Sequence, residues 1–106
     1  MNLVKIKEVK EMIKVIAKLT IKEDRVEEFK TFVPGLVEET RKEEGCLSYQ
    51  LFQDLKNKKV LTFIEDWESM EALQRHMKSK HFQEAMPKIA ELQEKEMELS
   101  VSNLVI

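Results

Sequence analysis

Apolar and polar residues alternate in the first regular stretch of the chain, residues 11–22. Every second residue from Ile13 to Ile21 is apolar, and Lys14 and Lys18 fall on the opposite side. A period of two is typical of a strand that buries one face. Patterns of the same kind predict three further strands, at 46–54, 60–67 and 97–106. The polar loop LKNKK joins the first two of these strands and indicates a hairpin.

A helical spacing of apolar residues separates the first strand from the hairpin. It begins near Asp24, which stands three residues before Glu27 as in a capping box, and runs to about residue 44. Pro34 is expected to kink or split this helix, because proline removes a backbone donor and crowds the preceding turn. Gly45 is the expected C-cap.

A second helical stretch lies between the hairpin and the last strand. Ser69 or Asp66 is expected to begin it, and the helix should break near Ser79 and restart. Its apolar stripe continues through about residue 95, with Pro87 as an expected distortion.

The predicted order of elements is βαββαβ, which is typical of a ferredoxin-like α+β domain with four antiparallel strands and helices on one face. We expect this domain to span residues 11–106. Residues 1–10 are expected to form either an N-terminal arm or an added edge strand.

The strand at 60–67 carries apolar residues on both faces: Leu61, Phe63 and Trp67 alternate with Val60 and Ile64. Helices can cover only one side of such a sheet, so the second side is expected to be mostly apolar and open. Burial of that side in a homodimer is the simplest solution.

Composition narrows the range of functions. Charged residues make up 36% of the 106-residue chain, yet the net charge is only −2 because lysines and glutamates are interleaved. This balance predicts no binding to nucleic acid and no basic membrane patch. A single cysteine, Cys46, cannot form an internal disulfide, and residues 1–10 lack the apolar core of a signal peptide. A cytoplasmic location is therefore expected.

The run EEGCLSYQLFQD, followed by LTFIEDWESMEALQRHMKSKHF, resembles the antibiotic biosynthesis monooxygenase (ABM) domain family, which includes small quinol monooxygenases. The densest part is Glu65-x-Trp67, then His76 nine residues after the tryptophan, then Ser79-x-His81-Phe82. The resemblance extends over roughly residues 12 to 105. The family often has proline before the second histidine, where this chain has Lys80.

The resemblance implies a dimeric α+β barrel with a pocket between sheet and helices in each subunit. It also implies oxidation of quinols or polyphenols by O₂ without flavin, haem or metal. A deprotonated dihydroxyaromatic ring can pass an electron to O₂ by itself, so the protein has to bind the ring, accept a proton and exclude water.

Two residues are the candidate catalytic groups. Trp67 either orients the substrate through its indole N–H or is simply a core anchor. His76 shares a helix face with Leu73 and Met77 and could accept a phenolic proton near neutral pH. Alternatively, it is a buried histidine bonded to a strand carbonyl or to Glu65.

The remaining candidates surround these two. An apolar wall for a small aromatic substrate is expected from Tyr49, Phe63, Phe82 and Met86. Glu65 lies on the strand face of Trp67 and is expected to form a structural ion pair with Arg75, His76 or the other subunit, which would tune the pKa of His76.

His81 is expected either as an N-terminal feature of the last helical segment or as a surface residue near the pocket rim, and Cys46 as a small packed residue. A metal site is not expected, because His76 and His81 are five residues apart, about 140° around an ideal helix.

Two alternatives to the oxygenase remain open. An isomerase or degradation enzyme for a phosphorylated signal such as autoinducer-2 would have the same fold, but would need Lys18, Arg75 or Lys80 to converge on the pocket. A non-catalytic ligand-binding dimer would use Glu65, Trp67 and His76 as a buried structural network.

Overall fold

The computed structural model describes residues 11–106, and the expectation for residues 1–10 lies outside this range. In chain order, its elements are β1 (Ile13–Thr20), a 3₁₀ turn η1 (Glu23–Arg25), α2 (Val26–Arg41), β2 (Cys46–Gln53), β3 (Val60–Trp67), α3 (Met70–Lys78), α4 (Lys80–Leu92) and β4 (Glu98–Asn103). The strands form one antiparallel sheet in the order β2-β3-β1-β4. This arrangement confirms the ferredoxin-like α+β fold.

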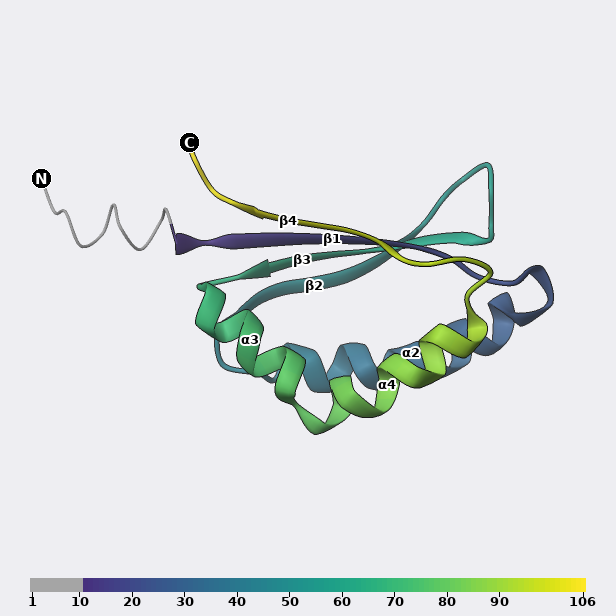
Figure 1. Ribbon diagram of the computed structural model, residues 1–106, viewed down its shortest axis with the longest axis horizontal. Coiled ribbons are helices and arrows are strands. Elements are labelled where there is room, and N and C mark those ends of the chain that lie inside the picture. Colours follow the sequence, from purple (N-terminus) through teal and green to yellow (C-terminus); the bar gives the residue numbers. More distant parts are fainter. Residues whose placement is uncertain (1–10) are drawn as a thin grey trace, which may run out of the picture.

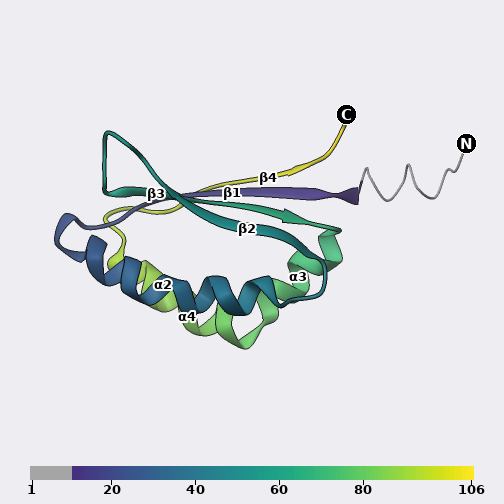
Figure 2. The same ribbon diagram turned by 180° about the vertical axis from the view of Figure 1, so that it is seen from behind.

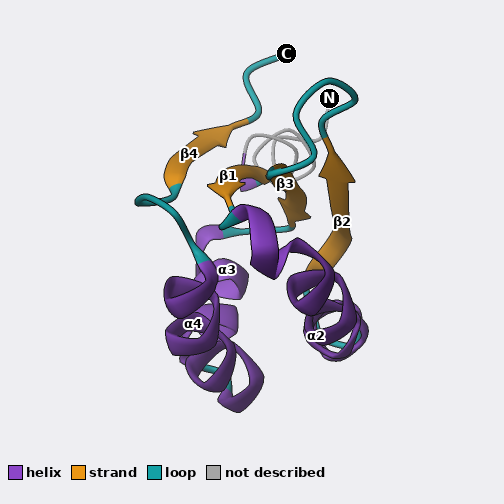
Figure 3. Ribbon diagram, turned by 90° about the vertical axis from the view of Figure 1, so that its right-hand side faces the viewer, coloured by secondary structure: helices purple, strands orange, loops and turns teal. Residues whose placement is uncertain are grey.

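All three helices cover the same face of the sheet (Figures 1 and 2). Seen along the sheet, α2 and α4 lie side by side beneath the strands, and α3 leads into α4 (Figure 3). The predicted alternation accounts for this packing: Val15, Ala17 and Leu19 of β1 are buried, whereas Lys14 and Lys18 are exposed. Within residues 11–106, no helix is both long and apolar enough to cross a membrane.

The opposite face of the sheet is mixed rather than mostly apolar, which corrects the sequence expectation. Ile16 of β1 pairs with Ile64 of β3, and Phe52 and Val60 lie on the same side. Next to this apolar stripe, Lys14 forms an ion pair with Asp66 at 2.9 Å. The edge strand β4 adds only polar side chains there, because its apolar residues point to the helical side.

Helix α2 differs in three ways from its prediction. It begins at Val26, and no side chain caps it; Asp24 lies in the preceding 3₁₀ turn. It continues through Pro34 without splitting, because buried Val33 and Leu36 hold the helix against the sheet on both sides of the proline. It ends at Arg41, so Gly45, with φ of +88°, belongs to the turn before β2 rather than to the C-cap.

The predicted break in the second helical stretch is confirmed at Ser79. The backbone of Ser79 is extended (φ −67°, ψ 153°), so α3 ends before it and α4 begins after it. Its hydroxyl accepts a hydrogen bond from Phe82 N at 3.2 Å and donates one to the His76 carbonyl at 2.6 Å. Ser69 caps α3 in the same way through Ala72 N. Two consecutive serine caps therefore set the direction of both helices.

Candidate active site

A cavity of about 200 Å³ lies between the helical face of the sheet and helices α3 and α4. Its wall consists of thirteen residues: Val15, Ala17, Tyr49, Phe63, Glu65, Leu73, His76, Met77, Phe82, Met86, Met97, Leu99 and Val101. The structure thus brings His76 and all five of the residues expected around the pocket into one place. Trp67 lies directly behind this wall.

The cavity is open along β4. Leu99 and Val101 belong to its wall, yet 62% and 47% of their surface is exposed. Two apolar side chains of this edge strand therefore remain in contact with solvent. A ligand seated here would cover them, and this apolar area would favour its binding.

Trp67 is fully buried at the end of β3. Its indole N–H donates to Glu65 Oε1 at 3.0 Å, so this donor already has a protein acceptor. The indole ring stacks on the imidazole of His76, with centroids 4.6 Å apart and planes tilted by 34°. Trp67 therefore supports His76 from behind and contacts the cavity only through its neighbours.

Glu65 is almost completely buried and forms its hydrogen bond with Trp67, not the expected ion pair with Arg75 or His76. Burial raises the pKa of Glu65 to about 7; the indole hydrogen bond counteracts this, and the charge of Glu43 adds to it. The cavity wall thus carries a carboxyl group that can exchange a proton near neutral pH.

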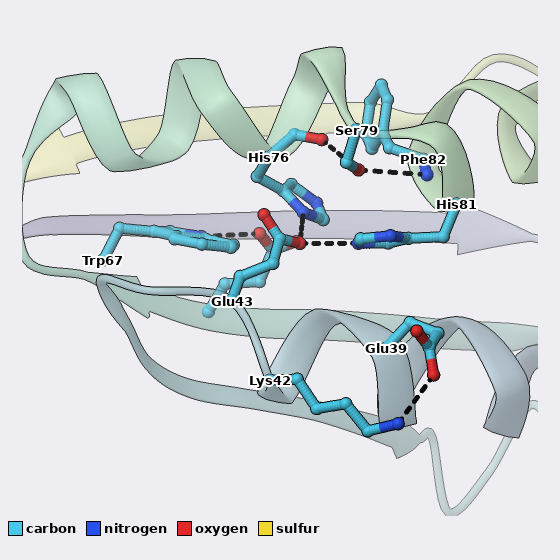
Figure 4. Close-up of polar contacts among 9 residues, drawn as sticks. Glu39, Lys42, Glu43, Trp67, His76, Ser79, His81 and Phe82 are labelled. Atoms are coloured by element: carbon cyan, nitrogen blue, oxygen red, sulfur yellow. Dashed lines mark hydrogen bonds and ion pairs between the residues drawn. The ribbon is translucent and has the colours of Figure 1, made fainter.

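His76 projects from α3 into the cavity wall with 2% of its side chain exposed. Its Nδ1 lies 2.7 Å from Glu43 Oε2 (Figure 4). Burial lowers the pKa of His76 below its ordinary value, against the opposing effect of Glu43. The imidazole is therefore neutral at pH 7, with the Nδ1 proton donated to Glu43. No hydrogen bond among the described residues uses Nε2.

His81, the second residue of α4, makes the same contact from the other side. Its Nε2 lies 2.6 Å from Glu43 Oε2, so one carboxylate oxygen accepts from both imidazoles (Figure 4). The ring centroids of His76 and His81 are 6.0 Å apart. His81 thus lies in the first turn of α4 and is held there by a specific contact with Glu43.

His76 and His81 do not point in different directions, as the spacing on a continuous helix predicted. An ideal helix would separate residues 76 and 81 widely, but the chain leaves the helix at Ser79 and turns before His81. The break therefore brings the two imidazoles to the same carboxylate. Among residues 11–106, Glu43, His76 and His81 form the one group of this kind, with a potential ligand atom of each lying within 4.8 Å of the others.

Glu43 was missed by the sequence analysis. It lies in the turn between α2 and β2, where its backbone N–H bonds to the Thr40 carbonyl at 3.0 Å. In the sequence it is one of several glutamates in a polar stretch, which is typical of a solvated turn. The signal in the sequence was its position two residues before Gly45, a glycine whose positive φ fixes the turn.

The other candidates take supporting positions. The Tyr49 ring lies 5.3 Å from that of Phe63 in the cavity wall, and burial raises the pKa of its hydroxyl well above the ordinary range. Phe82 meets His76 edge-on at 5.0 Å. Partial burial raises the pKa of Cys46, so its thiol is not activated, in agreement with a packing role.

The cations that a phosphate ligand would need are elsewhere. Lys18, Arg75 and Lys80 are exposed, and no lysine or arginine belongs to the described cavity wall. A larger groove of about 740 Å³ lies between α2 and β2 and does contain basic residues, but neither histidine lines it. The wall of the described cavity therefore lacks the cations that would hold a phosphate group.

Comparison with known proteins finds relatives that align with most of this chain. Over 81 residues the chain is 32% identical to the Bacillus subtilis (strain 168) protein named "Putative monooxygenase YcnE", covering 76% of this chain and 85% of that protein. It is 30% identical to the uncharacterised protein sll1783 of Synechocystis sp., covering 82% of this chain but only 59% of that protein's length.

Solved structures of similar proteins share the fold of this chain. A conserved protein from Methanosarcina mazei Go1 superposes with a TM-score of 0.86 at 37% identity, covering 92% of this chain and 96% of that one. A crystal structure of an antibiotic biosynthesis monooxygenase gives a TM-score of 0.84 at 34% identity, covering 89% and 99%. The family model for antibiotic biosynthesis monooxygenase matches residues 12–88. The chain belongs to the antibiotic biosynthesis monooxygenase family.

Proposed function

We propose that the protein is a cofactor-independent monooxygenase that oxidises a small quinol or polyphenol with O₂. The observation that carries this proposal is the Glu43–His76 pair in the wall of an apolar cavity: a neutral, buried imidazole is bonded at Nδ1 to a carboxylate. Family membership supports a monooxygenase-like function in general. The substrate class rests on the chemistry of the cavity.

The Glu43–His76 pair supplies a base of suitable strength for taking a proton from a phenol. With its Nδ1 proton donated to Glu43, His76 keeps the Nε2 lone pair free to accept a phenolic proton. The Glu43 carboxylate then stabilises the imidazolium that forms and holds the ring in the correct orientation. Trp67 fixes the same ring by stacking on its face.

The cavity suits a small aromatic ring. Tyr49, Phe63 and Phe82 give it aromatic walls that favour stacked or edge-on contacts. Its volume of about 200 Å³ is small for a binding site, because pockets for drug-sized ligands measure roughly 300–1,000 Å³. A substrate with one or two rings would fill it and cover the exposed Leu99 and Val101.

The reaction balances without a further reductant. Loss of the proton to His76 gives a quinolate, which transfers an electron to O₂; the resulting radicals combine at a ring carbon. Cleavage of the O–O bond leaves one oxygen atom on the ring and releases the other as water, so that the quinol becomes a hydroxyquinone. Glu65, whose pKa is raised to about 7, lies in the same wall and can return a proton to the departing oxygen.

The test is oxygen consumption by metal-chelated protein with a panel of quinols, each corrected for its autoxidation. His76→Ala and Glu43→Gln should each lower the rate at least about a hundredfold, in line with the contribution of a general base. Trp67→Phe should lower it less, since stacking is retained. Lys18→Ala, on the open face of the sheet, is the control and should retain the full rate. Absence of uptake with any quinol, together with an early-melting His76→Ala variant, would favour a non-catalytic binding protein instead.

A further inference from the structure

The structure holds two imidazoles and a carboxylate in a compact group at the cavity rim. His76 comes from α3, His81 from α4 and Glu43 from the turn before β2, so three separate segments converge there (Figure 4). The potential ligand atoms all lie within 4.8 Å of one another. We infer that Glu43, His76 and His81 form a binding site for a divalent transition-metal ion of the zinc class.

The donor set and geometry suit such an ion. Imidazole nitrogen and carboxylate oxygen are the donors that zinc-class ions use at sites with three protein ligands and an open fourth position. Bonds of about 2.0–2.2 Å in a tetrahedron place ligand atoms roughly 3.3 Å apart. The two N–O distances of 2.7 and 2.6 Å would widen slightly, and the two nitrogens would approach each other.

The three side chains are buried to different extents, which would both shield a bound ion and let it enter. His76 is 2% exposed, whereas Glu43 and His81 are 16% and 23% exposed. An ion could therefore enter from the solvent side between the turn and α4, and water would occupy its fourth position. The Ser79 cap holds the two histidine-bearing helices at the required angle.

Occupancy has a defined consequence for His76. A neutral imidazole that binds metal through Nδ1 carries its proton on Nε2, so Nε2 changes from acceptor to donor. The ion would replace the two contacts that the imidazoles make with Glu43. Metal binding would thereby remove the base that oxidation requires. This consequence, unlike the site itself, rests on the proposed function.

The test uses Co²⁺ as a spectroscopic probe on the full chain after chelation. Titration should saturate at one ion per chain and produce the visible d–d bands of a four-coordinate site, and Zn²⁺ should displace the colour. His81→Ala and Glu43→Gln should each weaken the affinity more than about a hundredfold, beyond the roughly 10–100-fold that is typical for loss of an outer-shell partner. Glu39→Gln changes a carboxylate of α2, four residues before Glu43 and paired with Lys42; it is the matched control and should bind Co²⁺ like the wild type.

The results separate the site from the proposed function. Saturable binding that both variants weaken supports the site, whether or not any quinol is oxidised. Absence of saturable binding to correctly folded wild-type protein overturns it, as does binding that neither variant changes. In active protein, one equivalent of Zn²⁺ should abolish oxygen uptake, and chelation should restore it.

Discussion

A single residue of the cavity wall, Glu65, makes the free energy of unfolding depend on pH. Its pKa is raised from 4.5 in the unfolded chain to about 7 in the fold. Between these values the folded protein binds more protons than the unfolded chain, so the free energy of unfolding falls as pH rises from about 4.5 to 7. At roughly 1.4 kcal/mol for each pKa unit, the penalty above pH 7 amounts to about 3 kcal/mol.

Glu65→Gln should remove this penalty while the amide oxygen still accepts from the Trp67 indole. We expect the variant to gain stability relative to the wild type as pH rises from 5 to 8, measured by urea unfolding at each pH. In a Glu43→Gln background the gain should be smaller, because the nearby charge no longer raises the pKa of Glu65. A stability difference that stays constant across this range would show that Glu65 is ionised throughout.

At the scale of elements, the site depends on two successive helices, α3 and α4, each of which begins at a serine cap. Ser69 caps α3 only, whereas Ser79 caps α4 and also bonds to the His76 carbonyl. Ser69→Ala and Ser79→Ala should each cost about 1 kcal/mol in the free energy of unfolding. Only Ser79→Ala should also disturb the imidazoles of His76 and His81, detected as shifts of their ring signals in NMR spectra. Equal shifts in both variants would contradict a specific role for the break.

The two glycines give a second contrast between elements. Gly45 has a φ of +88°, and a Cβ placed there would lie 2.5 Å from Ala72 Cβ, in the helix that carries His76. Gly45→Ala should therefore lose roughly 2 kcal/mol or more, from backbone strain together with the clash. Gly35 lies within α2 with open space around it, so Gly35→Ala should gain up to about 1 kcal/mol. Chemical unfolding measures both, and a stabilised Gly45→Ala variant would refute the assigned turn.

At the scale of the whole molecule, the open sheet face remains to be explained. Ile16 is 39% exposed and pairs with Ile64 across the strands, beside Phe52 and Val60. An apolar stripe of this kind favours a face-to-face homodimer, with the flanking Lys14–Asp66 pair at its border. The polar residues around the stripe would make such a contact narrower than the sequence predicts.

We therefore expect a homodimer in sedimentation velocity at low micromolar concentration. Ile16→Lys should shift it toward monomer, because the new charge would be buried at the contact. Leu55→Lys replaces a residue that is 98% exposed in the β2–β3 loop, and it should leave the association unchanged. A folded wild-type monomer under these conditions would refute the expected dimer.

The local pattern of the chain determined the elements and much of the cavity. Period-two strands, the hairpin loop and the Ser79 break are all visible in the sequence, because each depends on nearby residues. The alternation in β3 places Phe63 and Glu65 on the face they occupy, and helical spacing turns His76 inward. The kink or split predicted within α2 was less accurate, since packing of the helix against the sheet outweighs the local effect of Pro34.

Only the tertiary structure decided which groups act together. Glu43 is 33 residues before His76 and 38 before His81, and no local periodicity links positions so far apart. The change of direction at Ser79 and the turn at Gly45 bring them to one point, and burial then shifts the pKa values of His76 and Glu65. The sequence by itself determined which chemical groups face the cavity; their partners and protonation depend on distances and desolvation that exist only in the folded chain.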